Sequence, residues 1–395
     1  MTIQNKLKTA ILGLLMISCS PAVHEHDHEE LMIAATFADL QLAFFDAFSG
    51  ESTVGTTIQL PSAATLQVSN SRQYLAKVER VEGLVRFLKI ERNPSQDGSS
   101  IEWIGESIEA PSPTHFISTQ NHTLVFNDGD ASVIWLDESE KKPEPVWLRT
   151  PDNVAHHGAA VWLGNNRFAI TFKPEGEEGA LPKMVKLVDR AGKELSSTAS
   201  IAIRGIHGAA SNGDFAVFGS MDGALVMSAN GESFIIPNPA PLEASSGNWL
   251  GAITAHDKLD YFLGISKNHG VFKIDPKSKT IEPLFLNDAV KNHVVSPDGS
   301  KLVILTADLK VYVWDLAKNK VVVEKKIEEA LRGSEEEKNQ GHGPFSGLLI
   351  QVSNDYLFTL VPGHTSIKAY SLINLSMHHQ LDLKKQVNDF LLMKK

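Results

Sequence analysis

The chain has 395 residues, of which 42% are hydrophobic and 21% charged, so its composition is that of an ordinary globular protein. Its formal net charge is −10 at pH 7 with histidine neutral, and no cluster of basic residues is present. We therefore expect no nucleic-acid partner. The single cysteine, Cys19, excludes an intrachain disulfide and any metal site built from several thiolates. A metal site would have to use histidine and carboxylate ligands.

The first nineteen residues have the features of a bacterial lipoprotein signal. Two lysines precede an apolar run from Ala10 to Ile17, which is about half of the ~20 residues that a spanning helix needs. Cys19 follows and resembles the lipidated cysteine of a lipobox, with cleavage after Ser18. We predict export to the bacterial envelope, facing the periplasm, with the lipid as the only membrane contact. By resemblance to known sorting rules, Ser20 favours the outer membrane; a plain secretion signal is the alternative.

Residues 20–30 form a second segment, rich in histidine and carboxylate. Its sequence HEHDHEE alternates His24, His26 and His28 with acidic residues that include Asp27. In an extended chain this alternation places the three imidazoles on one side, where they suit Zn²⁺, Ni²⁺ or Cu²⁺. We predict a flexible metal-binding arm. A solvated acidic tether is the alternative.

From Leu31 onwards the pattern is that of short strands separated by Asn, Asp and Gly turns. Similar units recur at separations of 42 to 51 residues. They begin near Ala64, His115, His157, His207, Trp249, His293 and Pro344. A period of about 40 to 50 residues with four short strands per unit predicts an all-β fold, a β-propeller.

Both ends of the repeat region contribute to one further blade. Residues 31–62 supply three strands without an opening one, and Val387 to Met393 supplies an extra strand. Closing the ring with strands from both termini removes the free sheet edge. We predict one domain over residues 31–395 with eight blades, seven being the alternative. Glu328 to Gly343 is expected to be a long loop, and the Trp314-Asp315 pair, at the end of a third strand, is expected to be structural.

Fifteen histidines are present, and several stand at the openings of units. The first strand of each propeller blade lines the central channel and runs in the same direction, so equivalent positions converge near the axis. The candidate metal ligands are His115, His157, His207, His293 and His342, with Asp128 or Asp130 as a carboxylate. For any single histidine the alternative is a structural hydrogen bond within its blade. His156 should point away from His157 if both lie in a strand. The remaining histidines of the repeat region are expected to face solvent: His122, His256, His269, His364, His378 and His379.

Motifs of common enzymes are missing. The sequence has no G-x-S-x-G elbow, no G-x-x-x-x-G-K-S/T loop and no H-E-x-x-H pair. We therefore expect no catalytic residues. A propeller hydrolase or lactonase with dispersed residues remains an alternative.

Three stretches resemble the successive blades of a known family: PTHFISTQNHTLVFNDGDASVIWLD, AHHGAAVWLGNNRFAITF and IHGAASNGDFAVFGSMDGALV. They look like the periplasmic zinc metallochaperones of the AztD type, β-propellers that pass zinc to the solute-binding protein of a zinc ABC transporter. The resemblance implies His115, His157 and His207 as zinc-site residues, with the histidine-rich segment as a mobile arm. This chain departs from the family pattern at Ala209, where an acidic residue is frequent, and in lacking a cysteine pair.

Together these features predict a lipid-anchored, monomeric zinc metallochaperone that captures Zn and passes it to a solute-binding protein. Cu or Ni are alternative metals. Because ligation requires neutral imidazole, we expect the affinity for zinc to fall as the pH drops through about 6.5. Two other functions stay open: a non-metal interaction scaffold of the envelope, similar to WD-repeat propellers, and the hydrolase.

Overall fold

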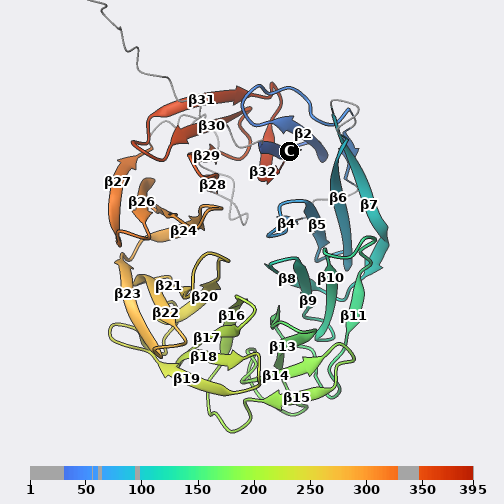
Figure 1. Cartoon of the computed structure of the whole chain (residues 1–395), viewed down its shortest axis with the longest axis vertical. Helices are drawn as coiled ribbons and strands as arrows, with labels where there is room; N and C mark the ends of the chain where they lie inside the picture. The colour runs from blue at the N-terminus through green and yellow to red at the C-terminus, as the bar shows by residue number, and fades with distance from the viewer. Residues whose placement is uncertain (1–30, 56, 61–64, 94–97, 328–346, 395) are drawn as a thin grey trace, which may run out of the picture.

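The computed structural model describes residues 31–55, 57–60, 65–93, 98–327 and 347–394. These residues form eight four-stranded antiparallel sheets, arranged as blades around one axis (Figure 1). The prediction of an all-β propeller with eight blades is confirmed, and the alternative of seven blades is wrong. Every regular element of the described part of the chain is a strand, so no helix there could cross a membrane.

In blades 1 to 7 the four strands follow one another in the chain, from the axis outwards. Blade 1 consists of β4 (Thr65–Val68), β5 (Tyr74–Glu79), β6 (Leu84–Asn93) and β7 (Gly98–Glu109). Blade 2 consists of β8 (Pro113–Thr119), β9 (His122–Asn127), β10 (Ser132–Asp137) and β11 (Val146–Leu148). Blade 3 consists of β12 (Ala160–Trp162), β13 (Arg167–Phe172), β14 (Met184–Asp189) and β15 (Glu194–Ser197). Blade 4 consists of β16 (Ile206–Ser211), β17 (Phe215–Ser220), β18 (Gly223–Ser228) and β19 (Ser233–Pro237).

The remaining consecutive blades follow the same order. Blade 5 consists of β20 (Leu250–Thr254), β21 (Phe262–Ser266), β22 (Gly270–Asp275) and β23 (Thr280–Leu286). Blade 6 consists of β24 (Val290–Val295), β25 (Lys301–Thr306), β26 (Lys310–Asp315) and β27 (Lys320–Lys326). Blade 7 consists of β28 (Leu349–Val352), β29 (Tyr356–Leu360), β30 (Ser366–Ser371) and β31 (Met377–Asp382).

Blade 8 joins the two ends of the described chain. Its strands are β32 (Val387–Lys394), β1 (Leu31–Phe37), β2 (Gln41–Asp46) and β3 (Ile58–Gln59), with β32 innermost. The pairing of β1 with β32 runs from Leu31 opposite Lys394 to Phe37 opposite Val387. This is the predicted closure, and it leaves no open gap in the ring.

The strands alternate their side chains between the two neighbouring blades. In β17, Ala216 and Phe218 are buried in a cluster shared with blade 3, whereas Val217 is buried in a cluster shared with blade 5. A strand that is covered on both faces explains why the second and third strands of most units read as continuous apolar runs. Asp315 ends β26 and binds Lys301 and Lys318, each at 3.1 Å, which is a structural role as predicted.

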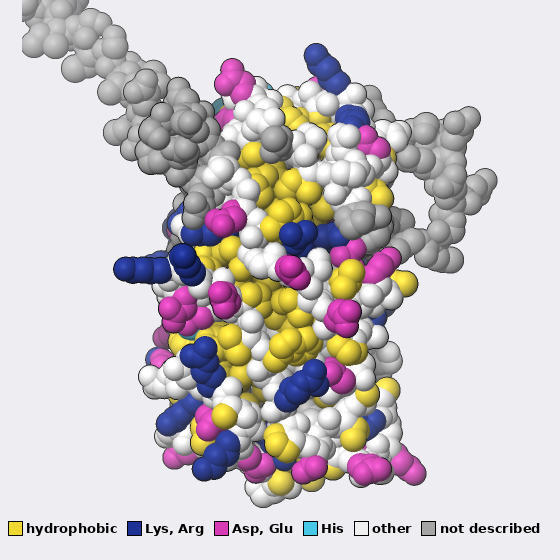
Figure 2. All heavy atoms as spheres, turned by 90° about the vertical axis from the view of Figure 1, so that its right-hand side faces the viewer, with side chains coloured by type: hydrophobic (Ala, Val, Ile, Leu, Met, Phe, Trp, Pro, Cys, Tyr) yellow, Lys and Arg dark blue, Asp and Glu magenta, His cyan; other side chains and the backbone are white. Residues whose placement is uncertain are grey.

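The outer side of blades 1 and 2 keeps some apolar surface. Figure 2 faces the side of the ring formed by β7 and β11, and a band of hydrophobic side chains runs along its middle between scattered charges of both signs. Trp147 is 37% exposed there, with the guanidinium of Arg149 5.0 Å from the centre of its ring. The outer strands are therefore less completely covered than the inner ones.

The ring has two distinct faces, because the inner strands start at one and end at the other. We call them the start face and the end face. The ends of β8 and β16 meet where the Thr119 hydroxyl donates to the Ser211 carbonyl. Lys394, the last residue of β32, donates its backbone N–H to Arg72 in the β4–β5 turn. Leu31, paired with Lys394, therefore lies on the end face.

Candidate metal centre

Three histidines from blades 2, 3 and 4 meet at the start face. The Nε2 atoms of His115 and His157 are 3.0 Å apart, and those of His157 and His207 are 3.2 Å apart. Tetrahedral zinc with bonds of about 2.0–2.1 Å separates its ligand nitrogens by about 3.3–3.4 Å. The triad therefore already has nearly the spacing that a zinc ion requires, and within the described residues it is the one group of this kind.

Each histidine of the triad is held at the beginning of its blade. His115 is the third residue of β8 and His207 is the second of β16, whereas His157 lies in the loop just before β12. Its neighbour His156 has a different partner, with its Nε2 2.9 Å from Thr171 Oγ1, and the two histidines lie in a loop rather than in the strand on which the prediction of opposite directions depended. The Nδ1–H of His156 donates to the Val154 carbonyl at 2.8 Å.

Glycines allow the close approach of backbone at this site. A Cβ on Gly158 would lie 2.2 Å from Thr171 Oγ1 and 2.5 Å from His156 Nε2, so the loop that carries His157 requires glycine. Gly208 has a φ of +77°, and a Cβ there would lie 2.7 Å from the Gly251 carbonyl oxygen. Steric crowding therefore requires the glycine after His157, and crowding together with a positive φ requires the glycine after His207.

Hydrogen bonds at Nδ1 orient two of the three imidazoles. His157 donates from Nδ1 to Asp128 Oδ2 at 2.9 Å, and His207 donates from Nδ1 to the Gly251 carbonyl at 2.7 Å. In a neutral imidazole with its proton on Nδ1, the lone pair is on Nε2. Both rings therefore present a metal-binding nitrogen to the centre of the triad.

The surroundings favour neutral imidazole and charged carboxylate. Burial, followed by the charges of His157 and His207, lowers the pKa of His115 to about 4. Burial alone would raise the pKa of Asp128, but the hydrogen bonds from His157 and Thr114, with a smaller contribution from the charge of Arg80, outweigh it, so this pKa is lowered. At neutral pH His115 can therefore bind a cation without first losing a proton.

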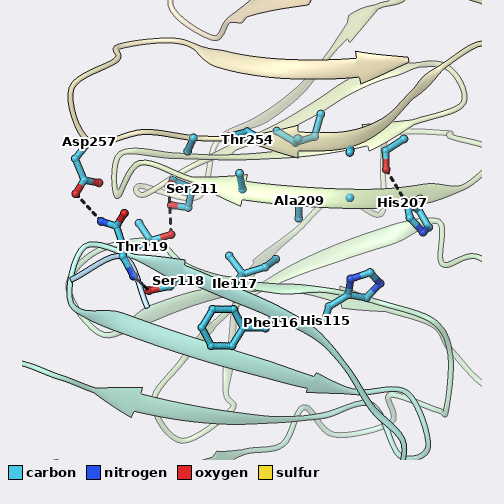
Figure 3. A pocket seen from close by; sticks show the side chains of 17 residues that line it. His115, Phe116, Ile117, Ser118, Thr119, His207, Ala209, Ser211, Thr254 and Asp257 are labelled. Carbon is cyan, nitrogen blue, oxygen red and sulfur yellow. Dashed lines mark hydrogen bonds between the residues drawn. The ribbon is translucent and has the colours of Figure 1, made fainter. Parts of the chain in front are cut away.

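His115 and His207 lie at one end of an open cavity of about 340 Å³, walled by β8, β16 and β20. In Figure 3, His115 and His207 stand at one end, while Asp257 is at the other with its hydrogen bond from Asn70, 2.7 Å long. The side chain of His157 is 35% exposed. A metal on the triad would therefore be accessible from outside, and the three imidazoles would leave a fourth coordination position for an exchangeable ligand.

Three candidate ligands of the described residues lie outside the triad. The carboxylate of Asp130 pairs with Arg149 Nη1 at 2.8 Å and is not part of the histidine group. His293 lies on β24, where its Nε2 is 2.8 Å from the hydroxyl of Thr254, and burial lowers its pKa to about 4. Asp128 supports His157 rather than sharing the centre of the triad. The predicted lipidation site and the remaining candidate ligands lie outside the described residues: Cys19, and His24, His26, Asp27, His28 and His342.

His122 differs from the expectation that it faces solvent. Its ring stacks on Trp162 with centroids 4.1 Å apart, and it accepts a hydrogen bond from Trp135 Nε1. Two contributors to the metal centre were also missed from the sequence: the carbonyl of Gly251 and the guanidinium of Arg80. A backbone carbonyl leaves no signal in a sequence, and an arginine in a turn is common on any surface.

The chain matches no protein-family model and no curated protein. Among solved structures it is similar to AztD from Citrobacter koseri, with a TM-score of 0.74 and 19% identity over 92% of this chain and 97% of that one. The apo form of that protein gives a TM-score of 0.73 at 18% identity, with the same coverage of both chains. More distant is Sqt1 from Chaetomium thermophilum bound to the N-terminus of the ribosomal protein L10, with a TM-score of 0.54 and 14% identity over 84% of this chain and 94% of that one. The chain therefore has the AztD-type β-propeller fold.

Proposed function

We propose that this protein is a zinc metallochaperone of the bacterial envelope, which binds the ion at the triad and passes it to another protein. The observation that supports this most directly is the group of three Nε2 atoms at 3.0 and 3.2 Å, formed by histidines from three different blades. A purely structural histidine needs only ordinary hydrogen-bond partners, as His156 has in Val154 and His293 has in Thr254. Three imidazoles converging from separate blades are the arrangement of a metal site.

Zinc suits the donor set best. Three neutral imidazoles with near-tetrahedral spacing are a common zinc environment, and a carboxylate bonded to a ligand histidine is typical of its outer contacts. Imidazole also binds Cu²⁺ and Ni²⁺, but these ions prefer tetragonal or square-planar geometry. The resemblance of the sequence to AztD-type zinc chaperones points to the same metal.

Transfer, rather than permanent storage, follows from the openness of the triad. A fourth position is free for an incoming ligand, and the 35% exposed side chain of His157 makes the start face the approach for an acceptor protein. We infer that the acceptor is the solute-binding protein of a zinc ABC transporter, as the resemblance implies. The acceptor would add a ligand at the fourth position before the triad releases the ion.

The histidine-rich arm would act as a separate collector of zinc. Leu31, to which the arm is joined in the sequence, lies on the end face, whereas the triad lies on the start face. The arm and the lipid on Cys19 would thus attach to the side of the ring away from the triad. Deleting residues 24–30 is then expected to reduce the number of weakly bound zinc ions and to leave the affinity of the triad unchanged.

The test is a competitive zinc titration followed by a transfer assay. We expect one tight zinc per chain in the wild-type protein and in the form without residues 24–30, and loss of that zinc in the variant with both His157→Ala and His207→Ala. His293→Ala is the matched control, since it removes an inner-strand histidine outside the triad. The loaded protein should then give its zinc to an apo solute-binding protein faster than to an equal concentration of unrelated protein. Tight binding that survives in the double variant would remove the basis of the proposal.

The open position also favours a second candidate, a zinc hydrolase. Three imidazoles plus a free position next to a cavity of about 340 Å³ are compatible with an activated water. Under this candidate the zinc-loaded protein hydrolyses small activated esters, and the activity is lost with His115→Ala. A rate equal to that of free zinc would exclude it.

A further inference from the structure

Arg80 forms an ion pair with Asp128, the carboxylate that holds His157. It follows β5, and its Nη1 lies 3.0 Å from Asp128 Oδ2, the same oxygen that accepts the Nδ1–H of His157. The guanidinium also donates to the Ser112 carbonyl at 3.2 Å, which fixes its position although its side chain is 52% exposed. A permanent positive charge is therefore separated from a metal ligand by a single carboxylate.

A positive charge at this position lowers the affinity of the triad for zinc in two ways. It repels a divalent cation on the triad directly, through a partly exposed medium of fairly high dielectric. It also shares the negative charge of Asp128, which would otherwise strengthen His157 as a ligand. Both effects lower the affinity for zinc without removing any ligand.

The field of Arg80 also reaches beyond its own partner. The other two triad histidines lie close to His157, which Asp128 holds: the Nε2 atoms of His115 and His207 are 3.0 Å and 3.2 Å from the Nε2 of His157. His115 belongs to blade 2 whereas Arg80 belongs to blade 1, so the effect crosses the boundary between blades. The charge is therefore felt at the centre of the triad.

We propose that Arg80 weakens zinc binding at the triad and thereby keeps the ion exchangeable. This rests on the proposed function, because it assumes that the triad binds zinc as cargo. The alternative is a structural role: if Arg80 mainly held Asp128 in place, removal of Arg80 would loosen His157 and weaken zinc binding. The two roles predict effects of opposite sign.

The chain offers a matched control two residues from Asp128. Arg149 pairs with Asp130 at 2.8 Å and is 61% exposed, so the two arginines have the same chemistry and similar exposure. Neither residue contacts a triad histidine. Arg149→Gln therefore removes an equivalent surface charge and leaves the positive charge beside Asp128 in place.

The test compares zinc affinity in the wild-type protein and in Arg80→Gln, Arg80→Met, Arg80→Lys and Arg149→Gln, at 0.1 M and 1 M salt. At 0.1 M salt we expect both charge-removing variants of Arg80 to bind zinc about fivefold to tenfold tighter and to release it correspondingly more slowly to a chelator. Arg80→Lys and Arg149→Gln should remain within about twofold of the wild type. The gain should shrink at 1 M salt, since the Debye length falls from about 10 Å to about 3 Å.

Each outcome has one meaning. Unchanged or weaker binding in folded Arg80→Gln and Arg80→Met, with tight binding in the wild type, overturns the role of Arg80 and leaves the chaperone proposal standing. An equal gain in Arg149→Gln also overturns it, because the effect would then come from net charge alone. Absence of tight zinc binding in the wild type refutes the proposed function itself. Thermal unfolding of each variant checks that it is folded.

Discussion

Replacing Asp128 with asparagine tests how the triad is oriented. The substitution keeps the size of the side chain and an oxygen that can accept the Nδ1–H of His157, but it removes the negative charge at 2.9 Å from that nitrogen. It also leaves Arg80, 3.0 Å from the same oxygen, without its counter-charge. Both changes make the triad a poorer site for a cation.

The expected magnitude follows from these contacts. Loss of an outer partner of a metal-ligating histidine typically lowers metal affinity 10- to 100-fold, which is about 1.4–2.7 kcal/mol. Asp128 is 9% exposed, so water can replace its charge only in part. We therefore expect at least a tenfold loss of zinc affinity in Asp128→Asn and a larger one in Asp128→Ala.

The assay is a competitive titration against a fluorescent zinc chelator at pH 7.5, with Asp130→Asn as the control. Asp130 is two residues away and pairs with Arg149 rather than with a histidine, so its variant should bind zinc as the wild type does. Equal affinities of Asp128→Asn and the wild type would refute this account of the site. So would an equal loss in both variants.

Three further predictions concern protons and packing. Zinc affinity should fall as the pH is lowered towards 4, because burial lowers the pKa of His115 to about 4 and protonation there removes a ligand; a titration that shows equal affinity at pH 7.5 and pH 4 would contradict ligation by His115. The apo protein should lose stability as the pH falls from about 6.5 towards 4, since the pKa of His293 is lowered to about 4 and the unfolded chain then binds more protons. The contribution of His293 to the free energy of unfolding is up to about 3 kcal/mol. The stability of His293→Gln, measured by urea unfolding, should therefore depend less on pH than that of the wild type. An equal pH dependence would show that His293 does not cause the loss of stability. Gly158→Ala should destabilise the fold by about 1–3 kcal/mol, because the added Cβ would lie 2.2 Å from Thr171 Oγ1. Gly55→Ala, with nothing within 4 Å of the added Cβ, should leave the melting temperature unchanged. Equal melting temperatures of the two variants would disprove the crowding at Gly158.

The sequence predicted the blades well because their signals are local. Alternating apolar residues and turn residues recur within each unit, and the three opening strands after Leu31 require a partner that Val387 to Met393 supplies. The equivalent positions of the unit-opening histidines predicted that two or three of them would converge near the axis, and the resemblance to AztD-type chaperones implied that these are His115, His157 and His207. Equivalent positions in neighbouring blades must lie close together near the axis of a propeller.

The finer geometry depends on features that repeat position does not specify. His293 opens a unit as the triad histidines do, but blade 6 lies away from blades 2 to 4 around the ring, so it binds Thr254 instead. Asp128 and Asp130 are equivalent candidates in the Asn127-Asp128-Gly129-Asp130 turn. Only the folded turn determines that the first faces His157 and the second faces Arg149.

The measurement that tests the central claim most directly is the crystal structure of the zinc-loaded protein, with anomalous diffraction recorded on both sides of the zinc absorption edge. The account predicts one strong zinc peak between His115, His157 and His207, with three nitrogens at about 2.0–2.1 Å and one light, exchangeable fourth ligand. A triad without zinc in protein that binds the ion tightly in solution, or a zinc peak elsewhere on the ring, would contradict it.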